Sequence, residues 1–210
     1  MISISRRHPW ALWPESIAPS FLDKPAVSVL QGDQNWKIEV EFEYTGNNMN
    51  LQKDIFCIVP KYTGLSIFEK RIFIGVGHDD KDEWYGTDTF IEPGSRERWT
   101  FEHKIGSELK VYRQTEPLRN ELVYEYGVTN RPLAVVDDPI LFIGTDKHIV
   151  DDQSSKPDII MYEFKITDKE KVIAHHDFND LVHDKSVDKT GNCNFLYQLG
   201  SKRVTKEQTN

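Results

Sequence analysis

A strict alternation of apolar and polar residues is the feature that most constrains how this chain folds. From Trp36 to Tyr44 every second residue is apolar, and Lys37 and a series of glutamates stand between them. Successive side chains leave opposite faces of a β-strand, so this pattern predicts a strand with one face in a core and the other in water. No stretch of about a dozen residues shows the apolar period of about 3.6 residues that marks an amphipathic helix. The alternation therefore predicts an all-β protein.

Further short segments with strand signals follow along the chain, and turn residues separate them. Clusters of Gly, Asp, Asn, Ser and Pro, as at 46–48, 77–82 and 92–95, are typical of such turns. Many short strands joined in this way indicate a sandwich or a barrel. The predicted strands are Asp54–Pro60, Leu65–Phe68, Arg71–Val76, Trp84–Ile91, Arg98–Lys104, Leu109–Arg113, Leu122–Tyr126, Ile140–Gly144, Ile159–Ile166 and Val172–Phe178.

Length and composition are consistent with one domain of this class. The chain has 210 residues, of which 38% are hydrophobic and 11% aromatic, which suffices for one large core. We divide it into an irregular N-terminal segment, 1–25, a sandwich domain, 26–200, and a polar C-terminal tail, 201–210. Prolines in the first segment argue against a helix there, and we expect that segment to pack on the domain or on a partner.

The strand motifs occur in an order that is informative beyond the individual patterns. The first motif in this order contains Trp99, and the next are Leu109–Tyr112, Asn120–Tyr124 and Leu141–Gly144. This order resembles that of laminin-G-like modules in the concanavalin A-like superfamily of lectins and glucanases. The resemblance covers residues 36–199 and implies a jelly-roll β-sandwich of two antiparallel sheets. It also implies loops that bind glycans or proteins, with catalysis in some subfamilies only. Such modules are common in viral structural proteins and bacterial surface proteins.

One loop departs from the pattern of these modules. A tight turn is usual before the Glu-Leu-Val strand, whereas this chain has the segment Arg113–Arg119 at that place. We interpret the segment as an insertion that lengthens the loop. Long loops on a rigid scaffold often bind ligands, so Arg113 and Arg119 are predicted ligand-binding residues.

A glycan site requires an aromatic ring and polar groups that converge on the sugar. The C–H face of a sugar stacks on a ring, and its hydroxyls need directional partners. Trp84 and Tyr85, followed by Gly86, are the best such pair, and we predict that they bind the ligand. A structural role for Trp84, at the rim or in the core, is the alternative, whereas Trp99 is assigned to the core. Other aromatic candidates are Tyr112, Tyr124 and Tyr126.

Acidic turns supply the candidate metal ligands. Asp79, Asp80 and Asp82 lie in one short segment, and Asp138 would come from another loop. Calcium takes about six to eight oxygen ligands from carboxylates and carbonyls, so these residues would form a calcium site if the fold brings them together. None of them has the spacing of an EF-hand loop, and a solvated turn is the alternative.

Catalytic carboxylates of the same superfamily are only weakly matched. Glycosidases use two carboxyl groups that face each other across the substrate. Glu39, Glu41 and Glu43 share one strand face but lack the spacing and the central aspartate of the glucanases. We interpret these glutamates as the solvated side of an edge or outer strand.

Histidines provide no stronger catalytic pattern. His103, Tyr112 and Arg113 are of the types that polysaccharide lyases of this fold use, but a domain of this size offers such a trio by chance. His175 and His176 are adjacent, so on a strand they point to opposite faces and do not bind one metal ion together. We expect them to be structural residues.

The net charge limits the classes of partner. The formal charge is -8 and the pI is near 5.4, which disfavours nucleic acid and anionic membranes as main partners. No apolar run approaches the roughly 20 residues that cross a bilayer, and the N-terminus lacks the pattern of a signal peptide. Two cysteines are too few for a disulfide framework. We expect synthesis in a reducing cytoplasm, compatible with later assembly into a virion.

These observations together favour a non-catalytic binding or structural module that contacts glycans, in a viral particle or a surface assembly. A glycoside hydrolase or polysaccharide lyase on the same fold is the first alternative. A module that binds protein only is the second. Each of these is compatible with a homo-oligomer.

Overall fold

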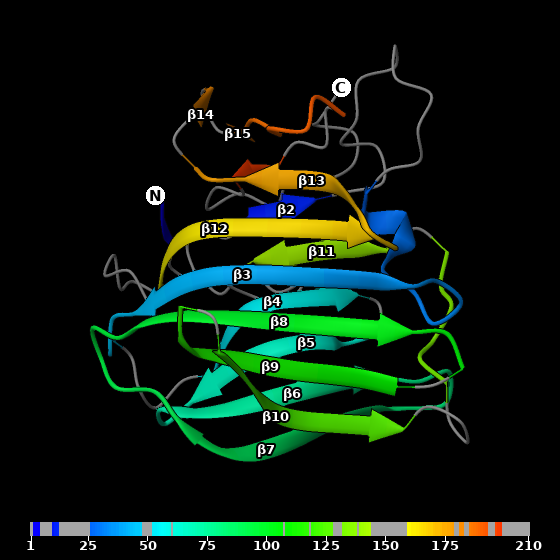
Figure 1. Ribbon diagram of the computed structural model, residues 1–210, viewed down its shortest axis with the longest axis horizontal. Helices are drawn as coiled ribbons and strands as arrows, with labels where there is room; N and C mark the ends of the chain where they lie inside the picture. Colours follow the sequence, from blue (N-terminus) through cyan, green and yellow to red (C-terminus); the bar gives the residue numbers. More distant parts are fainter. Residues whose placement is uncertain are drawn as a thin grey trace.

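Two antiparallel β-sheets packed face to face make up most of the described part of the computed structural model (Figure 1). Sheet A has seven strands in the order β1-β12-β3-β8-β9-β10, and β13 also pairs with β12. Sheet B has nine strands in the order β14-β15-β16-β2-β11-β4-β5-β6-β7. The structure describes residues 2–4, 10–12, 26–47, 52–59, 61–106, 108–117, 119–127, 132–137, 139–143, 159–178, 181–182, 185–192 and 196–198.

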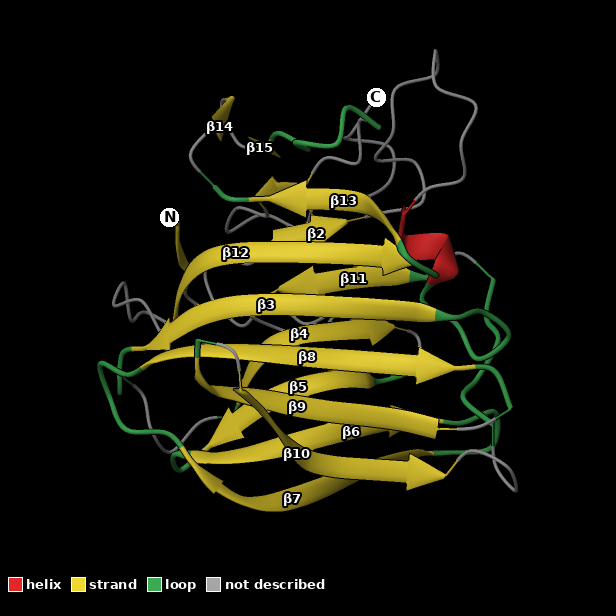
Figure 2. Cartoon of the chain, in the orientation of Figure 1, coloured by secondary structure: helices red, strands yellow, loops and turns green. Residues whose placement is uncertain are grey.

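The strands are short and make up most of the described part of the chain (Figure 2). One helical element, the 3-10 helix η1 (Ala26–Val29), accompanies them there. Sheet A consists of β1 (Ile2–Ile4), β3 (Trp36–Tyr44), β8 (Arg96–Lys104), β9 (Glu108–Glu116), β10 (Arg119–Gly127), β12 (Ile159–Asp168) and β13 (Lys171–His176). Sheet B consists of β2 (Trp10–Leu12), β4 (Lys53–Val59), β5 (Thr63–Phe68), β6 (Arg71–Gly77), β7 (Asp82–Phe90), β11 (Ile140–Ile143), β14 (Leu181–Val182), β15 (Lys185–Ser186) and β16 (Leu196–Gln198).

The predicted β-sandwich of two antiparallel sheets is confirmed, and the strand predictions match closely. Strand β3 has the predicted bounds, and its alternate residues Ile38 to Tyr44 are buried. The other predicted strands agree to within a few residues at most ends. The described residues include no helix long and apolar enough to cross a bilayer.

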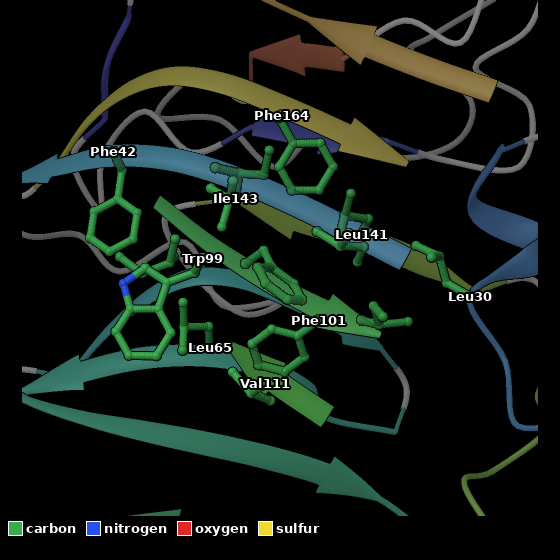
Figure 3. Close-up of a cluster of buried hydrophobic side chains, with 14 of the residues drawn as sticks. Leu30, Phe42, Leu65, Trp99, Phe101, Val111, Leu141, Ile143 and Phe164 are labelled. Atoms are coloured by element: carbon green, nitrogen blue, oxygen red, sulfur yellow. The ribbon is translucent and has the colours of Figure 1, made fainter. Parts of the chain in front are cut away.

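The core lies between the two sheets, and aromatic contacts within it join one sheet to the other (Figure 3). Phe56 of β4 packs edge-to-face against Phe101 of β8, with ring centroids 4.9 Å apart. It packs in the same way against Phe164 of β12 at 6.2 Å. Trp99 is fully buried in this core, as predicted. One ring of sheet B thus contacts two strands of sheet A.

The prediction for the N-terminal segment is corrected, and the one for the C-terminal tail is not tested. The segment 1–25, predicted to be irregular, contains β1 and β2. Strand β1 pairs with β12, and β2 pairs with β11 and β16. Each strand is three residues long, too short for an alternation to be visible in the sequence, so backbone pairing with neighbouring strands decides its form. The predicted C-terminal tail, 201–210, lies outside the described residues.

The predicted insertion at Arg113–Arg119 is wrong. Strand β9 continues to Glu116 and β10 begins at Arg119, so the two form one long hairpin. The end of this hairpin is polar on both faces, and only the cross-strand backbone pairing shows that it is strand. The prediction that β3 is an edge or outer strand is also wrong, since β3 lies between β12 and β8.

The core assignment can be tested at Phe101. Phe101→Ala is expected to lower the free energy of unfolding by about 3–5 kcal/mol, because it removes a fully buried ring and leaves a cavity. Urea denaturation followed by tryptophan fluorescence measures this loss. Phe90→Ala removes an exposed ring and is the matched control, with an expected change below about 0.5 kcal/mol. Equal losses in the two variants would contradict the core assignment.

Candidate functional site

Trp84 lies on the outer face of sheet B, in the edge strand β7. Residues along β7 alternate, so that Trp84, Gly86 and Asp88 face solvent while Thr87 is buried. The Trp84 side chain is 37% exposed, which is a large area for the largest side chain. Tyr85 follows Trp84 on the strand and therefore points to the inner side. The predicted pair Trp84 and Tyr85 is split between two faces.

The exposed rings of this face rest on glycines of the neighbouring strand. Trp84 is opposite Gly75, and a Cβ placed on Gly75 would lie 2.9 Å from two carbons of the Trp84 ring. Phe73 is opposite Gly86, where a Cβ would lie 3.1 Å from the Phe73 ring. Only glycine leaves room for a ring to lie across the strand at these points. The sheet therefore supports one side of the Trp84 ring, which is exposed, whereas the Phe73 ring is partly buried.

A bulge in β7 positions polar groups beside these rings. Three residues of β7, 87–89, stand opposite one residue of β6 between Arg71 and Phe73. Arg71 Nε donates to the Thr87 carbonyl oxygen at 2.5 Å, and Thr87 Oγ1 donates to the Ile72 carbonyl oxygen at 3.1 Å. The Arg71 guanidinium carbon lies 5.7 Å from the centroid of the Phe73 ring. Bulges commonly re-aim side chains at functional sites.

We call this surface the aromatic face. Its side chains combine exposed ring area with a guanidinium and a carboxylate, and Arg71 Nη2 lies 3.7 Å from Asp88 Oδ1. Sequence reasoning missed most of it. The signal was present in 71–75, where every second residue of a strand is Arg, Phe or Gly while the residues between them are isoleucines. A Phe on the polar face of a strand is unusual and indicates an exposed apolar surface. The aromatic face consists of Arg71, Phe73, Trp84, Asp88 and Phe90.

Tyr85 belongs to a different cluster, which closes the edge of the sandwich between β7 and β10. Its ring centroid is 5.3 Å from that of Tyr124 and 6.0 Å from that of Tyr126. Tyr126 Oη lies 3.1 Å from His78 Nε2, and Tyr85 Oη donates to Glu83. Burial is the main reason that the pKa of Tyr124 is raised well above its ordinary value. These rings pack against the core, which indicates a structural role.

The predicted residues Arg113 and Arg119 do not reach the aromatic face. Arg113 donates twice to the buried carboxylate of Glu97, with both distances 2.8 Å. This pairing raises the pKa of the Arg113 guanidinium. Arg119 is exposed at the start of β10. Both arginines belong to sheet A, whereas Trp84 lies on the outer face of sheet B.

The predicted calcium ligands form a tight turn before β7. The His78 amide donates to the Lys81 carbonyl oxygen at 2.9 Å, and Lys61 Nζ donates to the Asp79 carbonyl oxygen at 2.8 Å. Asp79 and Asp80 are exposed, and Asp82 opens β7. Within the described ranges, no group of three or more His, Cys, Asp or Glu side chains is placed to hold a metal ion.

Asp138 lies outside the described residues. The calcium site therefore stays a prediction.

The residues of the lyase alternative do not form one site. His103 is buried, its Nδ1 must donate to the Gln34 carbonyl oxygen at 2.7 Å, and its ring stacks on Trp36. Tyr112 and Arg113 are consecutive on β9 and point to opposite faces.

The glutamates of β3 are also engaged, since Glu41 accepts hydrogen bonds from Arg96 and Arg98. The adjacent histidines behave as predicted. His175 Nε2 contacts Glu163 at 3.0 Å, and His176 Nδ1 contacts Ser186 at 3.1 Å on the other face.

Comparison with known proteins shows the fold. No protein-family model matches the sequence, and no curated protein matches it. A point mutant of HCR/D is 15% identical, with a TM-score of 0.50, over 65% of this chain and 35% of that chain. The ligand-binding domain of botulinum neurotoxin serotype D, solved in complex with N-acetylneuraminic acid, is 15% identical. Its TM-score is 0.45, over 66% of this chain and 34% of that chain.

A protein of unknown function from Shewanella oneidensis MR-1 is 11% identical, with a TM-score of 0.46, over 85% of this chain and 64% of that chain. The chain spans about a third of the length of the botulinum neurotoxin domains that it resembles. At these identities the likeness concerns the β-sandwich alone. Membership in the concanavalin A-like or laminin-G-like superfamily stays a prediction.

The buried His103 makes stability depend on pH in a defined direction. Burial lowers its pKa in the folded state, against about 6.5 when unfolded. Above that pH both states are neutral at this residue. As the pH falls below it, the unfolded state binds the proton first, and stability decreases by up to about 1.4 kcal/mol per pH unit.

Urea unfolding of the wild type and His103→Gln at about pH 7.5 and about pH 5.5 tests this. The wild type is expected to lose up to about 1.4 kcal/mol more than the variant over this range. The same pH dependence in both proteins would contradict the buried neutral imidazole.

Proposed function

We propose that this chain is a non-catalytic glycan-binding module that binds sugars on the aromatic face. The observation that carries the proposal is the Trp84 ring, 37% exposed and supported across Gly75 on a sheet. A ring held in this way exposes an apolar surface without the entropy cost of fixing a mobile side chain on binding. The C–H face of a pyranose is the complementary surface.

Polar groups on the same face as Trp84 would supply the directional contacts that a sugar needs. Arg71 Nε donates to the Thr87 carbonyl oxygen and Nη2 donates to that of Gly86, which fixes the plane of the guanidinium. Its Nη1 remains as a donor for sugar hydroxyls, and the exposed Asp88 carboxylate is an acceptor. An open face of one principal ring with few polar groups favours weak binding, with a Kd on the order of 1 mM for a single sugar unit.

The charged residues of sheet A support the non-catalytic part of the proposal. A glycosidase needs a carboxyl pair that faces the substrate. Glu41 is held by Arg96 and Arg98, and Glu97 by Arg113. Each of these carboxylates is an ionised partner of an arginine, which disfavours the protonated acid that a glycosidase needs. Attachment of the module to a viral particle or a surface assembly belongs to the same proposal.

Trp84→Ala tests the proposal directly. A glycan array with the wild-type chain identifies a bound glycan, and titration calorimetry measures its affinity. Trp84→Ala is expected to weaken binding at least about tenfold, which corresponds to the loss of one stacking contact. Leu122→Ala, which truncates an exposed apolar residue of β10, is the matched control and should leave the affinity unchanged.

Chelation of calcium is expected to leave binding unchanged, since no described metal group lines this face. Two results would oppose the proposal. Absence of binding to every glycan on the array would favour a module that binds protein only. Release of reducing ends from the bound glycan would favour the hydrolase alternative.

A further inference from the structure

Two arginines share one carboxylate on the outer face of sheet A. Arg96 Nε and Arg98 Nη2 each donate to a different oxygen of Glu41 at 2.5 Å. The register places Arg98 opposite Glu41, and β3 and β8 lie side by side (Figure 1). Glu41 is only 12% exposed beneath them, whereas Arg96 is 57% and Arg98 47% exposed.

These residues line an open cleft of about 400 Å³, which we call the Glu41 cleft. Its remaining walls come from the end of the β9–β10 hairpin, where Gln114 and Thr115 add polar groups. The Arg96 guanidinium carbon lies 4.0 Å from the centroid of the Tyr162 ring. Arg96 is thus fixed by a carboxylate and by a ring, and the cleft is formed before any ligand binds.

Neighbouring carboxylates offset the charges of the two arginines around the Glu41 cleft. Arg96 and Arg98 bring two positive charges and Glu41 one negative charge. The second carboxylate of the lining, Glu97, is neutralised by Arg113. Glu163 lies 3.7 Å from Arg98, but it also contacts Lys165 and His175. Glu43 stands opposite Arg96 in the strand register and supplies a second negative charge, so hydrogen-bonding capacity and not net charge distinguishes the cleft.

Unused hydrogen-bond donors remain on both arginines. A guanidinium has about five N–H donors in a planar fork that matches an oxyanion. Arg96 donates to Glu41 through Nε, and Arg98 donates to Glu41 through Nη2. Within the described part of the chain, no acceptor takes the two Nη atoms of Arg96 or the Nε and Nη1 atoms of Arg98. These donors belong to side chains that line the cleft.

We propose that the Glu41 cleft binds an oxyanion, a sulfate or carboxylate group carried by an acidic saccharide. Such a group would accept charge-assisted hydrogen bonds from both guanidinium groups. Because Glu41 and Tyr162 already hold the arginines, little conformational entropy is lost on binding. This site is on sheet A and the aromatic face is on sheet B, so the inference does not depend on the aromatic face.

The test uses the full chain, two probes and a salt control. Inorganic sulfate and a heparin-derived tetrasaccharide are titrated while the arginine side-chain N–H signals are followed by NMR. Sodium chloride at the same ionic strength corrects for screening. Both probes are expected to shift the signals of Arg96 and Arg98 to saturation. The tetrasaccharide should bind at least about tenfold more tightly, since it adds contacts to the same anchor.

Variants separate the cleft from general charge effects. Arg98→Gln is expected to weaken tetrasaccharide binding at least about tenfold. Because this change also leaves Glu41 with one partner fewer, Gln114→Glu is a second variant. It places a negative charge in the cleft without removing either arginine, and it should weaken binding to a similar extent. Lys104→Gln removes the same charge from an exposed residue at the opposite end of β8 and is the matched control.

Three results would overturn the inference. The first is an equal loss of binding in Lys104→Gln and Arg98→Gln, which would assign the effect to net charge. The second is no advantage of the tetrasaccharide over inorganic sulfate, which would exclude a saccharide ligand. The third is unchanged binding in both cleft variants. Trp84→Ala should bind the tetrasaccharide as the wild type does, which separates a failure of this inference from a failure of the proposed function.

Discussion

The edge-to-face packing of Phe56 against Phe101 and Phe164 is the contact on which the rest of this structure depends. It joins β4 of sheet B to β8 and β12 of sheet A. Helix is almost absent from the described part of the chain, so the apolar face of each sheet has no other layer to pack against than the second sheet. The inner faces are therefore buried in the core, and the outer faces are the ones that remain toward solvent.

Strand register then decides which outer residues meet. The glutamates of β3 face Arg96 and Arg98 of β8, and a shift of one residue would bring charges into the core. Ion pairs of this exposure contribute little to stability individually. Their larger effect is to hold β3 and β8 in one register and to place two guanidinium groups beside one carboxylate. The Glu41 cleft is a consequence of that register.

The sequence predicted the strands well because a period of two is a local signal. It predicted the binding residues only in part, for two different reasons. Trp84 and Tyr85 are neighbours in the chain, and the same period of two separates them onto opposite faces. The turn before β10 was misplaced because the end of the hairpin carries polar residues on both sides, so nothing in its composition distinguishes strand from loop.

Side-chain direction was therefore determined by the sequence alone. The alternation in β3 predicts which residues enter the core, and this prediction needs no tertiary information. The tertiary structure decided which outward residues become neighbours. Tyr162 donates to Glu43 across 119 positions of sequence, and Trp84 rests on Gly75 of the adjacent strand. The physical reason is that side-chain direction follows from the local backbone, whereas strand neighbours are chosen by hydrogen bonds and core contacts between distant segments.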